Sequence, residues 1–259
     1  METLTDFRAV ALAVARRNLT HAFKNPALLV PAALFPLVFL LAFAGGLSAV
    51  QDVPGFDYPA GYTAFQFVFV FLQAAAFGGV FTGFAVAADF ESGFTQRLLL
   101  AAPRRAGLIA GYVLAGLGRF ALTGTVVFLA ALLAGMEVLG DPAQVLGLVT
   151  LALLVNVVAT LFGTGLSMRA RTMQVAPLVQ IPVFLILFMA PVYVPLDLLE
   201  GWIATAAGVN PATVLLEAGR GLLAGRPDET LLAFAVGAAG VAVLGVFAVR
   251  GLRRAERAV

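Results

Sequence analysis

Six long apolar runs alternate with shorter polar segments along the chain. A helix needs about 20 consecutive apolar residues to cross the hydrocarbon core of a bilayer, and each run reaches about that length. The pattern predicts an all-α polytopic membrane protein with six spans and with both termini on one side. The predicted spans are Leu28 to Ser48, Gly61 to Ala88, Leu108 to Gly135, Ala143 to Leu166, Val175 to Val194 and Leu231 to Val249.

The distribution of basic residues predicts the orientation. All but three of the 16 lysines and arginines precede span one, follow span six, or lie between spans two and three or spans four and five. Cytoplasmic segments of membrane proteins are enriched in basic residues, so this side is predicted to be the cytoplasm. Both termini are then cytoplasmic, in a multi-pass protein of the plasma membrane. The exceptions are Arg119, inside span three, and Arg220 and Arg226 on the far side.

Composition supports the membrane class and excludes several chemistries. The chain is 61% hydrophobic and 12% charged, with a mean hydropathy of +1.01, whereas soluble domains are about 45–50% apolar and about 25% charged. It has no cysteine and only one histidine, His21, which excludes thiolate and multi-histidine metal sites. Its only lysine, Lys24, follows no glycine-rich phosphate loop, so there is no Walker A motif. If ATP drives this protein, another chain must bind the nucleotide.

An amphipathic helix is predicted before the first span. Residues 1–25 carry polar side chains at steps of three and four, opposite an apolar face that includes Phe7, Val10 and Val14. Such a helix is typical of the inner membrane surface. Arg8 and Asn18 interrupt the pattern.

A second non-spanning segment, 195–229, is predicted on the outer side between spans five and six. Asn210 is expected to cap a short helix, with Pro211 at its first position and Gly225 as its stop. The segment is too interrupted to cross the membrane, which favours re-entrant or interfacial helices. Glu217 and Arg220, three residues apart, are expected to form a local ion pair. Residues 1–259 are thus expected to form a single transmembrane domain.

The first cytoplasmic loop, 89–107, reads DFESGFTQRLLLAAPRRAG. Asp89 or Ser92 is expected to cap a short helix that Pro103 ends. Phe90, Phe94, Leu98 and Ala101 would share one apolar face of this helix. Such a face either docks on a partner protein or lies on the membrane interface with no further role.

Two motifs in this order resemble those of the type 2 ABC exporter permeases, the group that includes daunorubicin-resistance permeases. The first motif is Asp89-Phe90-Glu91-x-Gly93, followed by Arg97-Leu98-Leu99 and Ala102-Pro103-Arg104-Arg105. The second is Asn210-Pro211-Ala212-Thr213 with Glu217-Ala218-Gly219-Arg220 and Leu222-Leu223-Ala224-Gly225. With the amphipathic N-terminus and six spans, the resemblance covers essentially the whole chain. Phe94 departs from the family pattern, in which threonine often follows the glycine.

The resemblance implies a half-exporter that dimerises, most simply as a homodimer, and binds a separate ABC ATPase subunit. The chain would bind no cofactor itself, because ATP and magnesium would reside on the ATPase, and it would perform no covalent chemistry. Membrane lipid would surround it, and no nucleic acid is expected as a partner. In the family the loop between spans two and three forms a coupling helix. By resemblance, the ATPase-docking residues are Phe90, Glu91, Gly93, Phe94, Thr95, Arg97, Leu98 and Leu99.

Candidates for the substrate path come from the same resemblance, since spans two and five line the path in this family. The candidates are Phe67, Phe71, Gln73, Arg119, Met189 and Tyr193. Each has a structural alternative. The phenylalanines could face lipid or a neighbouring helix, and Gln66, Gln73, Asn156 and Gln180 could join helices by hydrogen bonds. Arg119 could snorkel to the inner interface, pair with an acid or form a polar wall of the path.

The expected function is export of an amphipathic drug, lipid or glycan, powered by the partner ATPase. The competing hypothesis is an ion-coupled carrier, which ordinarily needs acids embedded in the membrane. Every acid in this sequence lies at or beyond the end of a predicted span. An intramembrane enzyme is disfavoured because His21 lies outside the spans.

Overall fold

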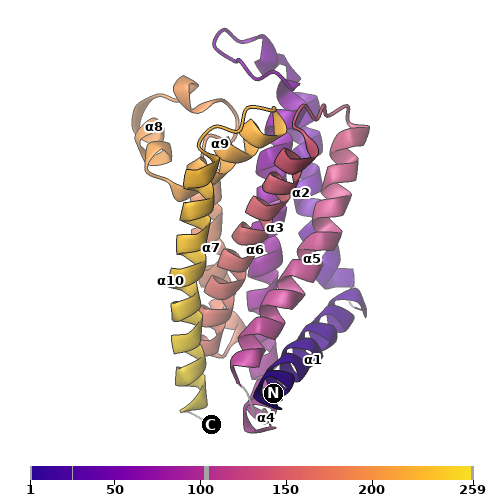
Figure 1. Cartoon of the computed structure of the whole chain (residues 1–259), viewed down its shortest axis with the longest axis vertical. Helices are drawn as coiled ribbons and strands as arrows, with labels where there is room; N and C mark the ends of the chain where they lie inside the picture. The colour runs from indigo at the N-terminus through magenta and orange to yellow at the C-terminus, as the bar shows by residue number, and fades with distance from the viewer. Residues whose placement is uncertain (1, 25, 102–104, 258–259) are drawn as a thin grey trace.

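The computed structural model describes residues 2–24, 26–101 and 105–257, and within these ranges the chain is helical with no strand. Figure 1 shows long, roughly parallel helices, with the two termini at the same end of the molecule. The long helices are α2 (Pro26–Gly46), α3 (Gly61–Glu91), α5 (Ala106–Leu133), α6 (Pro142–Ala170), α7 (Ala176–Phe188) and α10 (Thr230–Glu256). The remaining helices are α1 (Glu2–Lys24), η1 (Ser48–Asp52), α4 (Phe94–Ala101), η2 (Met173–Val175), η3 (Leu196–Leu198), α8 (Gly201–Gly208) and α9 (Pro211–Leu223).

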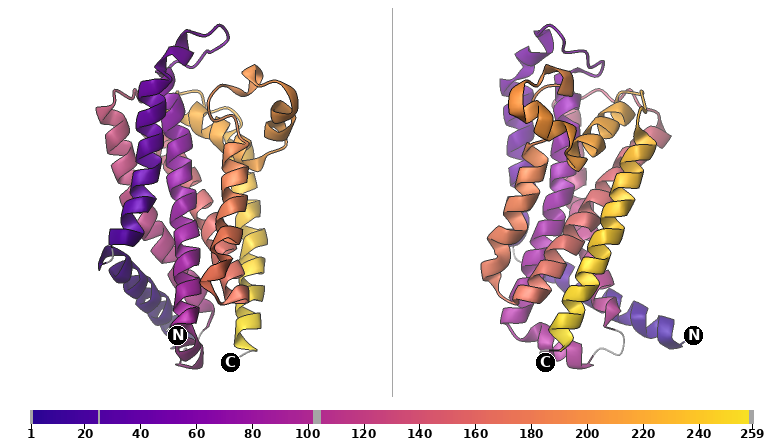
Figure 2. Two further views of the ribbon diagram at one scale, coloured as in Figure 1. Left: turned by 180° about the vertical axis from the view of Figure 1, so that it is seen from behind. Right: turned by 90° about the vertical axis from the view of Figure 1, so that its left-hand side faces the viewer.

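Four helices of the described chain, α3, α5, α6 and α10, are long and apolar enough to cross a membrane. Two shorter apolar segments, Val30–Gly46 and Met173–Phe188, coincide with α2 and with η2 and α7. Figure 2 shows α2 and α7 running beside the longer helices. Each predicted span therefore overlaps a helix. Span five is shorter than predicted, because α7 ends at Phe188 and the prolines at 191 and 195 follow in non-helical backbone.

Helix α3 forms the centre of the bundle, and nearly all of its side chains are buried. Close contact between helices requires small residues at the crossing point. On α3, a Cβ atom at Gly79 would lie 2.6 Å from the Cβ of Ala159, and one at Gly83 would lie 2.8 Å from the Cα of Gly163. These glycines let α3 pack directly on α6. Most phenylalanines of α3 are buried against neighbouring helices of the chain, whereas Phe81 and Phe84 are only half-buried.

Polar side chains inside the bundle join α3 to its neighbours. The Asn156 amide on α6 donates to the Ala75 carbonyl at 2.8 Å, and the Gln66 amide donates to the Val192 carbonyl at 2.9 Å. Asn156 thus joins two helices as predicted, whereas Gln66 joins α3 to the non-helical segment after α7. Gln73 is also buried, and its amide has no hydrogen-bond partner within the described chain.

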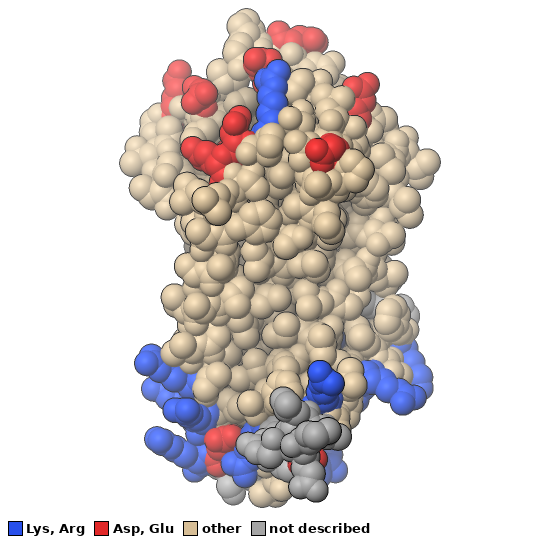
Figure 3. Space-filling view, in the orientation of Figure 1, with Lys and Arg blue, Asp and Glu red and all other residues tan. Residues whose placement is uncertain are grey.

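Charged side chains separate to the two ends of the molecule. In Figure 3 most lysines and arginines lie at the end that holds the termini, and most acids lie at the opposite end, with an uncharged zone between them. An uncharged belt between two charged ends is the surface expected of a protein that spans a bilayer. Together with the apolar helices, it makes the chain a multi-pass membrane protein.

The segment between α7 and α10 folds back on the acidic end of the bundle. Asn210 caps α9 as predicted, since its side chain accepts from the Ala212 backbone N–H at 2.9 Å. Pro211 is the first residue of α9, and Gly225 follows the helix with a φ of +76°. Glu217 and Arg220 form the predicted ion pair at 2.8 Å.

Arg220 does more than pair with Glu217. Its side chain is 2% exposed, its guanidinium carbon lies 3.3 Å from the centre of the Phe65 ring, and it donates to the carbonyls of Pro191 and Val192 at 2.8 and 3.2 Å. The same arginine therefore joins α9 to α3 and to the non-helical segment after α7.

Candidate coupling site

The cytoplasmic loop predicted between spans two and three contains a separate short helix, α4. The preceding helix, α3, continues to Glu91, so Asp89 and Phe90 belong to α3 and not to the short helix. Ser92 and Gly93 form the turn, and Gly93 has a φ of +69°, a conformation that favours glycine. The predicted capping role of Asp89 is therefore wrong. Ala102, Pro103 and Arg104, which the sequence assigned to the end of this helix, lie outside the described residues.

Asp89 is the centre of a polar network that joins three helices. Its two carboxylate oxygens accept hydrogen bonds from Nη1 of Arg17 on α1, at 2.8 and 2.9 Å. The Tyr112 hydroxyl on α5 donates to Asp89 at 2.9 Å. Asp89 is only 8% exposed, so these bonds replace the water that a carboxylate requires. The network fixes the end of α3 relative to α1 and α5.

Arg17 also contacts α4. Its guanidinium carbon lies 3.5 Å from the centre of the Phe94 ring, which is cation–π geometry. Phe94 is the first residue of α4 and directly follows the Gly93 turn. One arginine of α1 therefore contacts both the last turn of α3 and the first residue of α4.

Helix α1 lies against α5 through glycines. A Cβ atom at Gly111 would lie 2.6 Å from the Val14 Cβ, and one at Gly107 would lie 2.9 Å from the Phe7 carbonyl oxygen. The buried face of α1 includes Val14, as the sequence predicted, and also Asn18. Thus Asn18, which interrupts the apolar pattern of α1, belongs to the helix–helix contact.

Asn18 accepts a hydrogen bond from Nη2 of Arg119 at 2.5 Å, and both residues are buried. The arginine inside predicted span three therefore turns toward α1. No acid lies within ion-pair distance of Arg119 in the described part of the chain, so the predicted alternative of an acid pair is not found.

Two further contacts extend the site to the rest of the bundle. The Glu91 carboxylate accepts from the Thr172 hydroxyl at 2.8 Å and from the Met173 backbone N–H at 2.7 Å, which joins the end of α3 to the connection before α7. Nε of Arg105 donates to the Leu99 carbonyl at 3.1 Å, and its Nη1 lies 3.8 Å from Glu256 on α10. Arg105 thus connects α4 to the start of α5 and to the end of α10.

The structure divides the predicted docking residues into two groups. Phe90, Thr95 and Leu99 are buried against the bundle. Phe94 and Leu98 are half-buried, while Glu91 and Arg97 are exposed. The predicted apolar face is displaced, since Thr95 and Leu99 face the bundle and Leu100, with 73% of its surface exposed, faces solvent. Among the described residues of this loop, the exposed surface includes Glu91, Ser92, Arg97 and Leu100, with the edges of Phe94 and Leu98.

A comparison with protein families decides the class of this molecule. The model of the ABC-2 type transporter family matches residues 10–224. The chain belongs to the ABC-2 type transporter family. It is therefore a membrane permease subunit of an ABC transporter, a class that generally works with an ABC ATPase and is generally non-catalytic. No curated protein matches the sequence.

The path candidates of this ABC-2 permease do not form a single site, although Phe67 and Phe71 are in contact. Phe67 and Phe71 are buried where α3 meets α5, with Phe71 5.2 Å from Phe120 between ring centres. Gln73 is enclosed on α3, and Arg119 lies against α1. Only Tyr193 is exposed, beyond the end of α7, and Met189 lies half-buried nearby.

Sequence reasoning missed the roles of Arg17, Asp89 and Tyr112 in this ABC-2 permease. Arg17 is one of the polar positions of the predicted amphipathic helix, and Asp89 or Ser92 was expected to cap the short helix. A usable signal is the spacing of Gly107 and Gly111, which marks a face of α5 that accepts another helix. No group of three or more acidic, histidine or cysteine residues that could hold a metal ion occurs in the described ranges.

Proposed function

We propose that this permease is the transmembrane subunit of an ATP-driven exporter, coupled to a separate ATPase subunit through α4. The observation that carries the proposal is the Arg17 contact with both Asp89 and Phe94. A short helix that only rested on the membrane would need no such connection. Here α4 leaves Leu100 and Arg97 exposed, yet it is tied to α1 and α3.

The arrangement supports a mechanical role for α4. When the two ATPase subunits close on ATP, a force on the exposed side of α4 would pass through Phe94 and Arg17 to α1. The same force would pass through the Ser92–Gly93 turn to α3. Because α3 packs directly on α6 through Gly79 and Gly83, the displacement would reach the centre of the bundle. The permease itself would make and break no covalent bond.

The remaining architecture follows from this role. We propose that α2, α3, α5, α6, α7 and α10 form six spans, with both termini in the cytoplasm and the protein in the plasma membrane. The concentration of basic residues at the terminal end supports this orientation. Two permease copies would form a homodimer, and the cargo would be an amphipathic drug, lipid or glycan, as in daunorubicin-resistance-like permeases.

The test replaces the exposed Leu100 with aspartate in the full-length permease. We expect Leu100→Asp to abolish capture of the ATPase encoded beside the permease gene and to abolish ATP-dependent transport in proteoliposomes. Val53→Asp is the matched control, because Val53 is also an exposed aliphatic residue but lies in the loop between α2 and α3 at the opposite end. Undiminished ATPase binding and transport by Leu100→Asp would contradict the proposal.

An ion-coupled carrier remains the second candidate function. Asp89 is the buried acid closest to the membrane-spanning region, but its carboxylate is already occupied by Arg17 and Tyr112. This occupancy favours a structural role for Asp89 over ion binding. Transport driven by an ion gradient in proteoliposomes that contain the permease without any ATPase would establish the carrier and overturn the ATP-driven proposal.

A further inference from the structure

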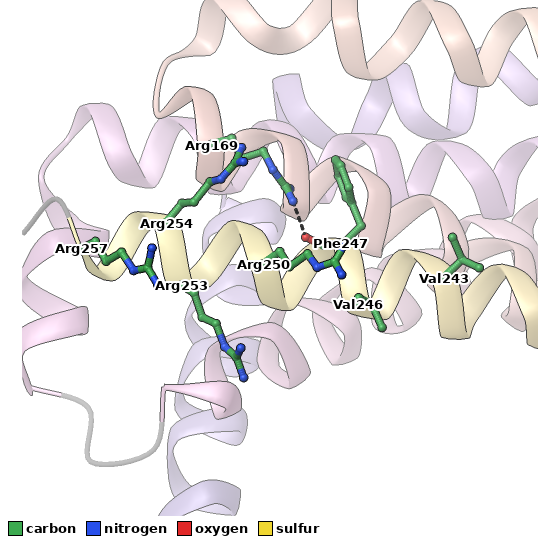
Figure 4. Close-up of a pocket in the computed structure, with 8 residues that line it drawn as sticks. All are labelled: Arg169, Val243, Val246, Phe247, Arg250, Arg253, Arg254 and Arg257. Atoms are coloured by element: carbon green, nitrogen blue, oxygen red, sulfur yellow. Dashed lines mark hydrogen bonds between the residues drawn. The ribbon is translucent and has the colours of Figure 1, made fainter.

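One face of α10 changes character along its length. Residues at helical steps of three and four are apolar from Val236 to Phe247 and then basic from Arg250 to Arg257. The basic part contains Arg250, Arg253, Arg254 and Arg257. Arg169, from the end of α6, joins them, and we call these five residues the basic cluster. Figure 4 shows the arginines along the end of α10, followed along the helix by Phe247, Val246 and Val243.

The basic cluster has no counter-charge in the described part of the molecule. No acid lines its pocket, and Glu256, the acid of this helix turn, lies toward Arg105 instead. Arg169 is held in place, because it donates to the Phe247 carbonyl at 2.8 Å and its guanidinium carbon lies 3.7 Å from the centre of the Phe247 ring. Arg250, Arg253, Arg254 and Arg257 make no ion pair in the described chain. Several neighbouring cations without an acid favour binding of an anion.

An apolar groove of about 580 Å³ lies directly above the basic cluster. Residues of α3, α6, α7, α9 and α10 line it, and they include Phe69, Phe162, Ile186, Leu215, Ala239 and Val243. Val243 also lines the pocket of the basic cluster, so the groove and the cluster form one continuous surface. This surface is apolar over most of its length and cationic at one end.

The position of Arg250 matches the edge of a bilayer. Along a helix with a rise of about 1.5 Å per residue, Thr230 and Arg250 are about 30 Å apart. The hydrocarbon core of a membrane is also about 30 Å thick. If Thr230 marks one boundary, Arg250 lies at the other, and the arginines that follow lie at the depth of the lipid headgroups. The groove then lies within the acyl-chain region.

We propose that α10, α6 and α7 bind an anionic phospholipid from the leaflet next to the termini. Its phosphate would contact Arg250, Arg253 and Arg254, and one acyl chain would occupy the apolar groove. Basic pockets between membrane helices are known to accept such headgroups. A protein partner outside the membrane would reach the arginines but not the groove. The continuity of the two surfaces through Val243 therefore favours lipid.

The experiment measures lipid binding to the delipidated full-length permease in detergent by native mass spectrometry. The probes are phosphatidylglycerol and phosphatidylcholine with identical acyl chains. We expect the wild type to prefer phosphatidylglycerol, and Arg253→Gln/Arg254→Gln to weaken that binding roughly 25-fold, at about fivefold for each arginine. The control Arg8→Gln/Arg16→Gln removes the same charge from exposed positions of α1 and should change the affinity less than twofold.

A second variant tests the groove. Ala239 is exposed and lines it, so Ala239→Phe should fill the groove without disturbing a buried contact. We expect this variant to weaken binding of long-chain phosphatidylglycerol but not of its dihexanoyl analogue. Equal binding of the long-chain lipid by Ala239→Phe and wild type would overturn the acyl-chain assignment.

Three other outcomes would also overturn the proposal. One is equal loss of phosphatidylglycerol binding in the arginine variant and the control, which would indicate nonspecific attraction to charge. Another is displacement of the lipid by inorganic phosphate at equal concentration, which would indicate a site for free phosphate. The third is loss of ATPase capture by Arg253→Gln/Arg254→Gln with lipid affinity unchanged, which would assign the arginines to a protein partner.

Discussion

Arg17 and Asp89 lie 72 positions apart in the sequence, yet the guanidinium of one lies 2.8 Å from the carboxylate of the other. The pair joins the amphipathic N-terminal helix to the last turn of the central helix α3. Neither residue belongs to a predicted span. Their contact makes α1 part of the bundle, and not only a helix that rests on the membrane surface.

Removing Arg17 should destabilise this end of the molecule. Arg17→Gln leaves Asp89, a buried carboxylate, with Tyr112 as its remaining partner, and we expect a loss of about 1–3 kcal/mol. In the Arg17→Gln protein, Asp89→Asn should lower the free energy of unfolding by less than it does in the wild type, because the two residues are coupled. Thermal unfolding of the four proteins of this double-mutant cycle provides the measurement. Arg16→Gln, an exposed neighbour, is the control, and a cycle that shows strict additivity would contradict the coupling.

A methyl group at Gly111 should separate α1 from α5. In Gly111→Ala the new Cβ would lie 2.6 Å from the Val14 Cβ and 2.7 Å from the Ala11 carbonyl oxygen. Overpacking of this kind costs about 1–3 kcal/mol. We expect a lower melting temperature and faster proteolysis of α1. Gly245→Ala is the matched control, since a Cβ there meets no atom within 4 Å. The same melting temperature for both variants would show that the α1 contact is loose.

Loss of Arg220 should open the segment between α7 and α10. Arg220→Met would leave the carbonyls of Pro191 and Val192 without their donor and Glu217 without its counter-charge. Breaking a buried pair in this way costs about 3 kcal/mol. Arg220→Lys should retain only part of the stability that Arg220 provides, because lysine lacks the planar arrangement of donors that the guanidinium has. Hydrogen exchange of residues 191–224 would report the opening, and wild-type protection in Arg220→Met would rule out this role.

Tyr58 should make the same segment sensitive to alkaline pH. Burial raises the pKa of the Tyr58 phenol, whose hydroxyl donates to the Arg220 carbonyl at 2.9 Å. A raised pKa means that the stabilising contribution is complete below the unfolded-state pKa of about 10 and is lost as the pH rises above it. Tyr58→Phe should therefore lower stability by about 1 kcal/mol at neutral pH and reduce the further loss above pH 10. The measurement is the free energy of unfolding as a function of pH. The same slope above pH 10 for the wild type and Tyr58→Phe would exclude a role of Tyr58 in the alkaline sensitivity.

Helix positions were predictable because long apolar runs have few alternatives in a bilayer. The cap at Asn210 and the Glu217–Arg220 pair also followed from the sequence, since each depends on residues within one helical turn. The Arg17–Asp89 and Asn18–Arg119 contacts did not follow, because they join distant segments whose relative positions depend on the whole packing. For the same reason, the sequence did not show that Leu99 of α4 is buried against the bundle.

The two hydrogen bonds to Glu91 have a consequence for how the bundle responds to a load. They connect the end of α3, directly before α4, with the short connection that precedes α7. A force on the terminal end of the molecule would thus reach α3 and α7 together, through contacts at the helix ends and not only through the apolar interior. At its other end α7 is held as well, since the Asn210 amide donates to the Ile186 carbonyl at 2.6 Å and the Phe188 ring lies 5.4 Å from that of Phe69. A displacement that enters α7 near Met173 would therefore be passed on to α9 and α3 at the acidic end of the bundle.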